Sequence, residues 1–571
     1  MRNNSLIKRK YREFFFPTIV MALSNSLTSI VDGIIVSIFL GAEQMAAINT
    51  CLPIPQLNAT IATLIGIGAS TLISIAKGRR EKQTADSTFT SYIILFILFV
   101  GLLLGIYTVF FEPICRFLSS DSTLSPFVHS YFGILRWGAG FHIAAESLGY
   151  IASAEGHAKI SSAAMITANV FNIVLDIVLI RFFGMGISGA AIASVLAFCI
   201  QVCILLFLYV FSKKRRTVNL YFKKIGKNSI STLKTGFSAA LGLVLVGVKI
   251  ACVNRIVTGI AGADGMIAFS LCIAALTIAS LLITGASDTM MPILGIYHGE
   301  GDRSGVKLVF NYALKVLIIT TLALMAVLEL FPQIFFLLYK ITDETTISIA
   351  LPAIRIYAIS LIGVSYSFHY LYYFMGIERE AESTVVSVVD GLAVVPFAFL
   401  LSKILGIYGV WYSFIATEFL SFVIILIMLK KGSSKNDKSE TRLLCEFSFD
   451  ETQVSGALQK IQSVLSEQKI DPKTANIATL SIEEIAVNSA EFTKAARKKN
   501  RTVTFDITIK NTGEALVVSV CDDGEHFDPI AYKADDSEEY PISHISLLKT
   551  IASKLEYSYV IGLNKTSVLL K

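Results

Sequence analysis

The chain has 571 residues, of which 54% are hydrophobic and 16% are charged, and its formal net charge is +6. Soluble domains carry about 25% charged residues, so this composition excludes a wholly soluble protein. The basic residues lie in short loops between apolar runs, which excludes a nucleic-acid-binding surface as the reason for the positive charge.

Apolar runs of about 20 residues follow one another from Phe14 to Leu429, and each is long enough to cross about 30 Å of hydrocarbon. A single hydrophobic core stops growing near about 250–300 residues, so these runs do not form one soluble core. We therefore expect an α-helical membrane protein with twelve transmembrane helices. The predicted spans are 14–38, 47–76, 88–110, 127–152, 160–182, 187–211, 234–258, 265–291, 308–331, 348–374, 382–401 and 408–429.

Loop charge predicts the orientation of these spans. Basic residues concentrate at one set of helix ends, namely Arg2, Lys8, Arg9, Lys10, Arg12, Lys77, Arg79, Arg80, Lys82, Lys213, Lys214, Arg215, Arg216, Lys223, Lys224, Lys227, Arg303, Lys307, Arg379, Lys430 and Lys431. The opposite loops carry only Arg116, Arg181, Lys340 and Lys403. Cytoplasmic loops are enriched in Lys and Arg, so we expect both termini in the cytoplasm. The first apolar run is too long for a signal peptide, which predicts a retained helix and a multi-pass protein of the inner (cytoplasmic) membrane.

The two halves of the membrane region repeat each other. LGAEQMAAI around Gly41 resembles AGADGMIAF around Gly262, at an offset of 221 residues. Further matches at offsets of 221 or 220 pair Lys77-Gly78 with His298-Gly299, Glu155-Gly156 with Met375-Gly376, and Gly186 and Gly189 with Gly406 and Gly409. Two such halves are typical of transporters with a substrate path between lobes. We expect a first lobe over 1–212, a cytoplasmic linker over 213–233 and a second lobe over 234–431.

Two segments carry a family resemblance. FPTIVMALSNSLTSIVDGIIVSIFLG (Phe16 to Gly41) and ANVFNIVLDIVLIRFFGMGISGAAIAS (Ala168 to Ser194) resemble helices one, five and six of the multidrug and toxic compound extrusion (MATE) family. The resemblance covers Arg12 to Lys431. It implies two six-helix bundles, alternating access, and export of drugs or other amphipathic organic compounds driven by a Na⁺ or H⁺ gradient.

Acidic residues in the spans predict a cation-coupling site. An ionisable group at mid-helix costs about 2.5–3.5 kcal/mol, so each needs a reason. Asp32 lies in the first span, and Asn172 and Asp176 lie four apart on one face of the fifth. A carboxylate and a carboxamide oxygen can bind a hard cation, or the acid a proton. The resemblance implies that these three residues, with the hydroxyl of Ser194 where Thr is more usual, form the coupling-ion site. The alternative is that both acids only cap hydrogen-bond networks between helices.

Other polar groups in the spans leave alternatives open. Lys249 and Arg255 in the seventh span would favour an anionic substrate. Each of the remaining groups is more often part of a buried pair or an interface anchor than a ligand-binding residue. They are His142, Glu146, Arg355, His369, Asp390 and Glu418.

A second domain follows a polar linker at 432–441. RLLCEFSF, RTVTFDITIK, ALVVSVC, YSYVIG and TSVLLK are predicted strands, and residues 450–468, 473–496 and 543–555 are predicted helices. This pattern indicates an α/β sandwich domain over 442–571, within the usual size of an independent domain.

Two motifs of this domain, LSIEEIAVNSAEF and VCDDGEHFDP, resemble the histidine-kinase-like (GHKL) ATP-binding fold, closest to anti-sigma-factor kinases. The resemblance implies ATP and Mg²⁺ as ligands, with Glu484 as a base and Asn488 as a metal ligand. It also implies that Asp522 reads the adenine amino group and that Gly524 lets the backbone approach the nucleotide.

The third motif of that fold is missing. SHISLLK carries His544 and Ser546 where phosphate-binding glycines are expected, and phosphates need bare backbone N–H groups. We therefore expect a degenerate domain without ATPase or kinase activity. It is either a nucleotide sensor or a nucleotide-free interaction module.

Three functions compete at this point. The first is secondary active efflux with a regulatory cytoplasmic domain, by a transporter rather than an enzyme, without a cofactor for transport. The others are lipid or oligosaccharide flipping and membrane sensing. The sequence contains no Walker GxxxxGK[ST] motif, which argues against ATP-driven transport. We expect a monomer in the lipid bilayer that binds a small-molecule substrate. A cytoplasmic regulatory protein that binds the tail is a further candidate partner.

Overall fold

The computed structural model describes residues 5–118, 124–210, 218–338, 343–433, 442–496, 502–513, 515–530 and 544–570. The chain divides into two compact units. The membrane unit comprises residues 13–429. The tail unit comprises residues 430–571 together with the N-terminal segment up to Arg12. Residues 434–441 of the predicted linker at 432–441 and residues 213–217 of the predicted linker at 213–233 lie outside the described residues.

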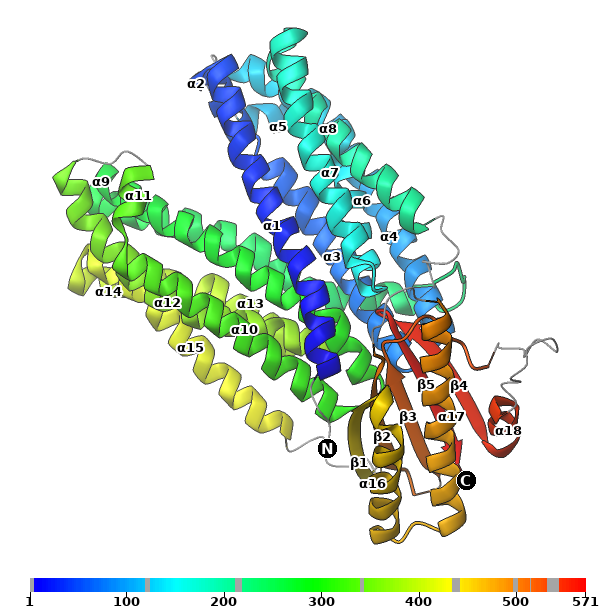
Figure 1. The fold of residues 1–571 in the computed structure, drawn as a ribbon. Coiled ribbons are helices and arrows are strands. Elements are labelled where there is room, and N and C mark those ends of the chain that lie inside the picture. The colour runs from blue at the N-terminus through cyan, green and yellow to red at the C-terminus, as the bar shows by residue number, and fades with distance from the viewer. Residues whose placement is uncertain are drawn as a thin grey trace. The chain divides into compact units, whose positions relative to one another are not determined.

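The first lobe is a bundle of long helices (Figure 1). Its helices are α1 (Ser5–Leu40), α2 (Ala42–Thr50), α3 (Pro53–Gly78), α4 (Lys82–Val109), α5 (Phe111–Leu118), α6 (Ser125–Ala154), α7 (Ala158–Asp176) and α8 (Gly186–Leu205), with π-helical turns η1 (Ile177–Phe182) and η2 (Leu206–Val210). Buried apolar side chains such as Ile65, Tyr92 and Phe132 form its core.

The second lobe has a core of its own. Its helices are α9 (Ile225–Gly299), α10 (Arg303–Leu330), α11 (Gln333–Leu338), α12 (Glu344–Gly376), α13 (Glu380–Leu392), α14 (Val394–Leu405) and α15 (Ile407–Ser433). Phe269, Tyr357 and Trp411 are buried at its centre. Two separate cores agree with two lobes. α9 begins at Ile225, earlier than the predicted start of the second lobe at 234.

The described part of the chain contains ten helical segments that are long and apolar enough to cross a membrane. They are Glu43–Gly78, Lys82–Val109, Ala158–Phe182, Gly186–Val210, Ile225–Gly262, Asp264–Gly299, Arg303–Leu330, Glu344–Gly376, Glu380–Leu405 and Ile407–Lys431. α1 and α6 are long helices at the other two predicted spans. The many-helix membrane fold is therefore confirmed, and the count of twelve spans stays a prediction.

The internal repeat is visible in the backbone. Gly41 and Gly262 have φ of 87° and 57°, and each interrupts a helical path at the matching place in its lobe. Gly186 and Gly406 repeat this at φ of 57° and 58°, at the start of the last long helix of each lobe. Side-chain-bearing residues rarely adopt such φ values, so glycine is needed at all four positions.

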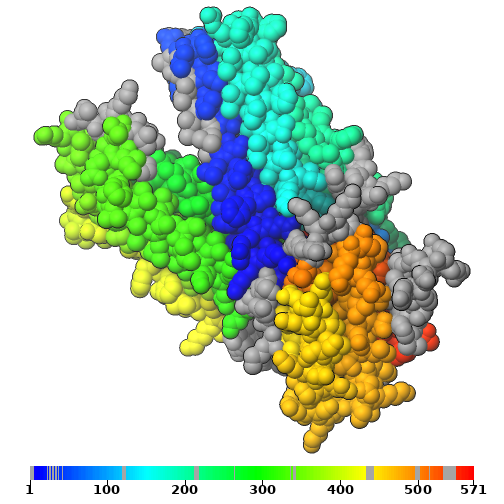
Figure 2. All heavy atoms as spheres, viewed as in Figure 1, coloured from blue at the N-terminus to red at the C-terminus, as the bar shows by residue number. Residues whose placement is uncertain are grey.

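The two lobes touch where α3 crosses α9. A Cβ atom on Gly68 would collide with the carbonyl of Thr232, and one on Gly78 with the carbonyl of Ile296. The missing side chains therefore let the two helices approach backbone to backbone. Figure 2 shows the lobes of the membrane unit in contact at one end and diverging toward the other.

The tail unit is one antiparallel sheet with helices. Its elements are β1 (Arg442–Asp450), a 3₁₀ turn η3 (Glu451–Gln453), α16 (Val454–Glu467), α17 (Pro472–Ala496), β2 (Thr504–Asn511), β3 (Leu516–Asp522), α18 (His544–Ile551), β4 (Lys554–Val560) and β5 (Leu563–Leu570). The strand order is β1-β2-β3-β5-β4. Buried side chains of α16, α17 and the sheet, such as Ile461, Ile482 and Ile507, form the core. The predicted order of strands and helices is confirmed.

The N-terminal segment joins the tail unit rather than standing alone. Arg9 forms an ion pair with Asp523 and donates to the hydroxyl of Thr504 at 3.4 Å. Lys10 is buried, and its Nζ lies 3.0 Å from where a Cβ of Gly562 would stand. This differs from the predicted start of the first lobe at residue 1, because the basic segment finds its acidic partner more than 500 residues away.

Candidate functional site

The acids predicted for ion coupling meet inside the first lobe. Asp32 of α1 and Asp176 at the end of α7 bring their carboxyl groups within hydrogen-bonding reach of each other. Asn172 lies one turn earlier on α7, and it and Asp176 are only 5% and 2% exposed. The π-helical turn η1 starts directly after Asp176, and such turns are frequent at functional sites.

Three polar atoms at this place are buried without a hydrogen-bond partner. They are Oδ1 of Asp32, Oδ1 of Asp176 and Nδ2 of Asn172. Each buried unsatisfied group costs about 1–3 kcal/mol. A bound cation or proton would satisfy the two carboxyl oxygens, whereas Nδ2 of Asn172 is an N–H donor that needs an acceptor.

Tyr131 of α6 completes the surroundings of the acids, and sequence reasoning missed it. Its hydroxyl lies within hydrogen-bonding reach of Ser194 and close to Asp32 and Asp176. Ser194 on α8 donates to the carbonyl of Ala190 at 3.1 Å. Ser194 thus adjoins the acids through Tyr131. Nothing in the sequence distinguishes Tyr131 from other aromatic residues of an apolar helix.

The donor set suits a hard monovalent ion. It consists of two carboxyls, a carboxamide, a phenol and a hydroxyl, all oxygen donors of the kind that Na⁺ or H⁺ requires. Among the residues that the structure describes, no group of three His, Cys, Asp or Glu side chains could hold a metal ion. These oxygen donors suit a hard cation rather than a transition metal.

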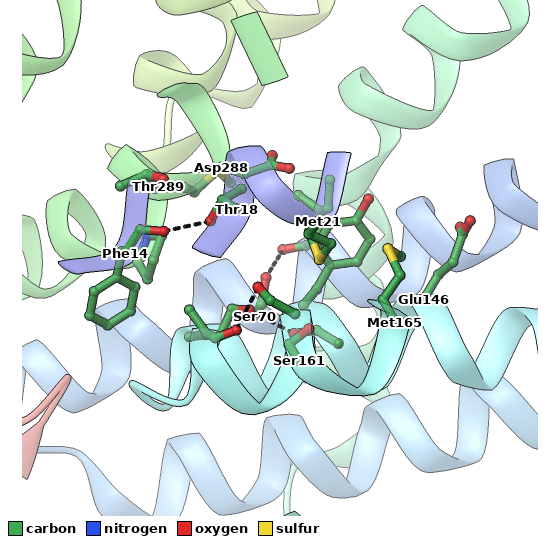
Figure 3. Close-up of a pocket in the computed structure, with 18 of the residues that line it drawn as sticks. Phe14, Thr18, Met21, Ser70, Glu146, Ser161, Met165, Asp288 and Thr289 are labelled. Atoms are coloured by element: carbon green, nitrogen blue, oxygen red, sulfur yellow. Dashed lines mark hydrogen bonds between the residues drawn. The ribbon is translucent and has the colours of Figure 1, made fainter. Parts of the chain in front are cut away.

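A second feature is a cavity of about 190 Å³ between the lobes (Figure 3). Its lining comes from α1, α3, α6, α7 and α8 of the first lobe and from α9 and α12 of the second. Serine and threonine hydroxyls alternate with apolar surface such as Met21 and Met165. Glu146 and Asp288 are its acids, and none of the described residues that line it is basic.

Asp288 was not singled out from the sequence. Its carboxylate is within hydrogen-bonding reach of Tyr372, and Tyr150 lies beside both Asp288 and Glu146. The signal that finds Asp32 would also have found it, because it is an acid near the end of the predicted span 265–291. The acids and aromatic rings give the cavity a surface suited to a cationic organic molecule.

Several other polar residues of the spans have partners. His142 stacks on Phe198 with ring centroids 4.2 Å apart and lies 3.3 Å from Glu146. Arg355 lies 3.8 Å from Glu329. His369 contacts the carbonyl of Phe310 at 3.2 Å. These contacts agree with the interpretation as pairs and interface anchors.

In the tail unit, Asp522 and Gly524 lie together at the end of β3. Oδ1 of Asp522 accepts hydrogen bonds from Ser489 Oγ at 2.9 Å, Gly524 N at 2.9 Å and Asn564 Nδ2 at 2.8 Å. Burial raises the pKa of Asp522 to about 6, against the opposing effect of these three donors. A Cβ on Gly524 would lie 2.6 Å from Oγ1 of Thr493 and 2.8 Å from Oδ1 of Asp522. The position therefore admits only glycine.

Glu484 and Asn488 share one face of α17. Asn488 Nδ2 donates to the carbonyl of Glu484 at 2.6 Å and lies 3.4 Å from its Oε2. The sequence did not single out Ser489 and Asn564, which orient Asp522. Each of the two predicted pairs is thus brought together, and the binding of a nucleotide by them stays a prediction. On the phosphate side, α18 starts at His544, while residues 531–543 and the side chains of His544 and Ser546 lie outside the described part.

Comparison with known proteins identifies the class of both units. The MatE family model matches residues 17–178 and 238–400, one match in each lobe. The chain therefore belongs to the MatE family and is a membrane transporter. The model of the histidine kinase-like ATPase domain matches residues 447–565. The predicted combination of a MATE transporter with a histidine-kinase-like tail is confirmed.

Curated relatives are similar over the membrane unit. The multidrug export protein MepA of Staphylococcus saprophyticus is 24% identical over 437 residues, which cover 74% of this chain and 94% of that protein. MepA of Staphylococcus haemolyticus is 25% identical over 406 residues, covering 69% and 88%.

Solved structures share the fold. A MOP superfamily transporter from Pyrococcus furiosus, described as having a binding pocket of reverse polarity, has a TM-score of 0.70 and 21% identity, covering 75% of this chain and 96% of that one. An outward-facing multidrug resistance MATE family transporter gives the same TM-score, identity and coverage.

Proposed function

We propose that this protein exports amphipathic organic cations, drugs among them, in exchange for Na⁺ or H⁺. The observation that carries the proposal is the cavity between the lobes, with Asp288 and Glu146 in its lining and no basic residue among the lining residues described. The similarity to MepA proteins, which are named as multidrug export proteins, supports it.

Asp32, Asn172, Asp176 and Ser194, with Tyr131 beside them, form the proposed coupling-ion site. Two carboxylates in contact in a low-dielectric interior repel each other, so a cation or a proton between them removes that repulsion. The unsatisfied carboxyl oxygens of Asp32 and Asp176 are the atoms that would bind it, with the carboxamide oxygen of Asn172 as a further donor. The choice between Na⁺ and H⁺ stays open, because the donor set suits both.

The ion site and the cavity share two helices, which gives coupling a physical route. α1 carries Asp32 and also lines the cavity with Thr18 and Met21, and α7 carries Asp176 and also lines it with Ser162 and Met165. α7 is tied to α1 by hydrogen bonds from Ser162 Oγ to the Pro17 carbonyl at 3.0 Å and from Asn169 Nδ2 to Ser24 Oγ at 3.1 Å. A shift of these helices on ion binding would therefore change the cavity.

The flippase alternative loses the observation that supported it. Neither Lys249 nor Arg255 lines the cavity, and Lys249 pairs with Asp390 inside the second lobe. An anionic head group would instead meet Asp288 and Glu146. The sensor alternative has no comparable observation in its favour.

For the tail we propose a nucleotide-binding regulatory role without turnover. Asp522, oriented by Ser489 and Asn564, would accept from the adenine amino group, and Gly524 leaves room for the ring. Asn488 would hold Mg²⁺ beside the phosphates of bound ATP. His544 and Ser546 replace the glycines that phosphates require, so hydrolysis is not expected. The basic loops favour cytoplasmic termini in the cell membrane, where this nucleotide is present.

The test is transport by purified protein in proteoliposomes under imposed Na⁺ or H⁺ gradients. A fluorescent organic cation such as ethidium serves as the substrate. Asp288→Asn and Glu146→Gln should weaken export, whereas Glu329→Gln, a matched change outside the cavity, should not. Export that ignores the gradient, or that is equally fast for an organic anion, would overturn the proposal.

A further inference from the structure

The second lobe contains a buried charged cluster that neither the cavity nor the coupling-ion site uses. It consists of Lys249 on α9, Asp390 on α13 and Glu418 on α15, and is called here the C-lobe triad. Lys249 Nζ lies 3.3 Å from both the carbonyl oxygen and Oδ2 of Asp390. The carboxyl of Glu418 is within hydrogen-bonding reach of Asp390 and accepts from Ser367 Oγ at 2.9 Å. All three residues are less than 10% exposed.

The charges of the triad do not balance when every group is ionised. One ammonium faces two carboxylates, which leaves one negative charge in a membrane-spanning bundle where unpaired charge is costly. The neighbours from the packed elements are Tyr357 and Ser367 of α12 and Cys272 of α9, and all three are ordinarily neutral. Among the described residues around the triad, none supplies a second positive charge. One proton held between the carboxyls makes the cluster neutral.

An unsatisfied atom marks the place for that proton. Oδ1 of Asp390 is buried and has no hydrogen-bond partner, although Oδ2 of the same carboxyl faces Lys249. Close helix packing keeps the three side chains of the triad near one another. A Cβ on Gly391 would collide with Leu245 of α9, and one on Gly363 would collide with Glu418. Close helix approach at these glycines holds Asp390 near Lys249 and Glu418 near α12.

The triad lies on the helices of the second lobe that correspond to the helices of the coupling-ion site. The family model matches residues 17–178 and 238–400, which relates the first span of α9 to α1 and α13 to α7. The recurrence of Gly186 and Gly189 as Gly406 and Gly409 relates α15 to α8. In the first lobe these helices supply an acid, an acid with an amide, and a hydroxyl. In the second lobe they supply an amine, an acid and an acid. The tethered ammonium of Lys249 thus occupies the role that a free cation has in the first lobe.

We propose that the C-lobe triad is a second ion site, selective for protons, which binds one exchangeable proton between Asp390 and Glu418. Lys249 takes the place of a metal cation, and its fixed charge repels Na⁺. The reaction is acid dissociation alone: the carboxyl O–H bond breaks, the electron pair stays on the carboxylate and the proton passes to water. The proposal stands apart from drug export, since it concerns protonation of the resting protein.

The test is infrared spectroscopy of the purified full-length protein in detergent at neutral pH, where a protonated carboxyl gives a carbonyl band that shifts in D₂O. Glu418→Gln should remove one such band relative to the wild type. The matched control Glu329→Gln changes a glutamate of the same lobe that faces Arg355 at 3.8 Å, and should leave the band in place. Addition of Na⁺ should not displace it.

A second variant covers the case in which Glu418→Gln does not fold. Lys249→Met removes the fixed positive charge, so both carboxyls must be neutral and a second protonated band should appear. A Glu418→Gln spectrum identical to that of the wild type, a Lys249→Met spectrum without a new band, or loss of the band on addition of Na⁺ would each overturn the proposal. The first two results would mean an ionised structural pair only.

Discussion

The two lobes are built from one repeated pattern of helices, yet they treat buried charge differently. In the first lobe, Asp32 and Asp176 face each other without a basic partner among the described residues that adjoin them. In the second lobe, Lys249 lies against Asp390. Under the two proposals above, the first lobe takes Na⁺ or H⁺ from solution, whereas the second lobe, which carries a lysine, takes only a proton. The comparison teaches that a duplicated fold can divide ion chemistry between its halves.

The strongest way to break this comparison is to remove the acids of the first lobe. Asp32→Asn and Asp176→Asn should each reduce gradient-driven export to background, because a single remaining carboxyl no longer needs a cation to relieve repulsion. Efflux from proteoliposomes under an imposed gradient measures this, with membrane insertion of each variant as the control. Normal efflux by either variant would remove the ion-site hypothesis.

The next largest effect is expected at the cavity. Asp288→Asn should lower the affinity for an organic cation about 10- to 100-fold, because a charge-assisted contact contributes about 1.5–3 kcal/mol. Binding of a neutral analogue of the same shape should change much less. Equal losses for the cation and the neutral analogue would mean that Asp288 acts only through its contact with Tyr372.

Asp522 of the tail unit is a buried acid that differs from those of the first lobe, because its carboxylate already accepts hydrogen bonds. The pKa of Asp522 is raised from 3.8 to about 6. Its stabilising contribution is therefore complete below about pH 4 and is lost as the pH rises through about 6. Asp522→Asn should remove this loss, about 1–3 kcal/mol near neutral pH, and should also abolish binding of adenine nucleotides. Thermal unfolding and nucleotide titration of the full-length protein measure both effects. Retained nucleotide binding would contradict the assigned role.

The smallest effect is expected where the lobes touch. Glu378, just beyond α12, contacts His298 of α9 and Arg79 just beyond α3. The hydrogen bond from His298 and the guanidinium of Arg79 hold the pKa of Glu378 below its usual 4.5. The contact is therefore present above about pH 4.5 and is lost as the pH falls through the lowered pKa.

Glu378→Gln should shift the balance between closed and open states of this interface only a few-fold, because exposed pairs contribute about 0–1 kcal/mol. Accessibility of a cysteine introduced beside Gly78 would report the shift. No change in labelling at neutral pH would mean that the backbone contact of α3 and α9 alone holds the lobes together.

Local patterns in the sequence predicted a large part of this protein. Long apolar runs predicted the membrane helices, and the matching segments around Gly41 and Gly262 predicted the repeat. Both glycines adopt a positive φ, which explains why glycine stands at both positions. The alternating strands of the tail appear in the predicted order. Asp32 and Asp176 could be selected because a carboxyl in an apolar helix is costly, whatever it contacts.

Tertiary structure alone decided which of these groups meet. Tyr131 adjoins the acids, Asp288 faces the cavity, and Lys249 is paired with Asp390 rather than directed at an anionic substrate. The partners in each case come from helices far apart in the chain, and helical periodicity gives the face of a residue but not the neighbour of that face. The charge on a buried side chain is known from the sequence, whereas what neutralises it is known only once the helices have packed.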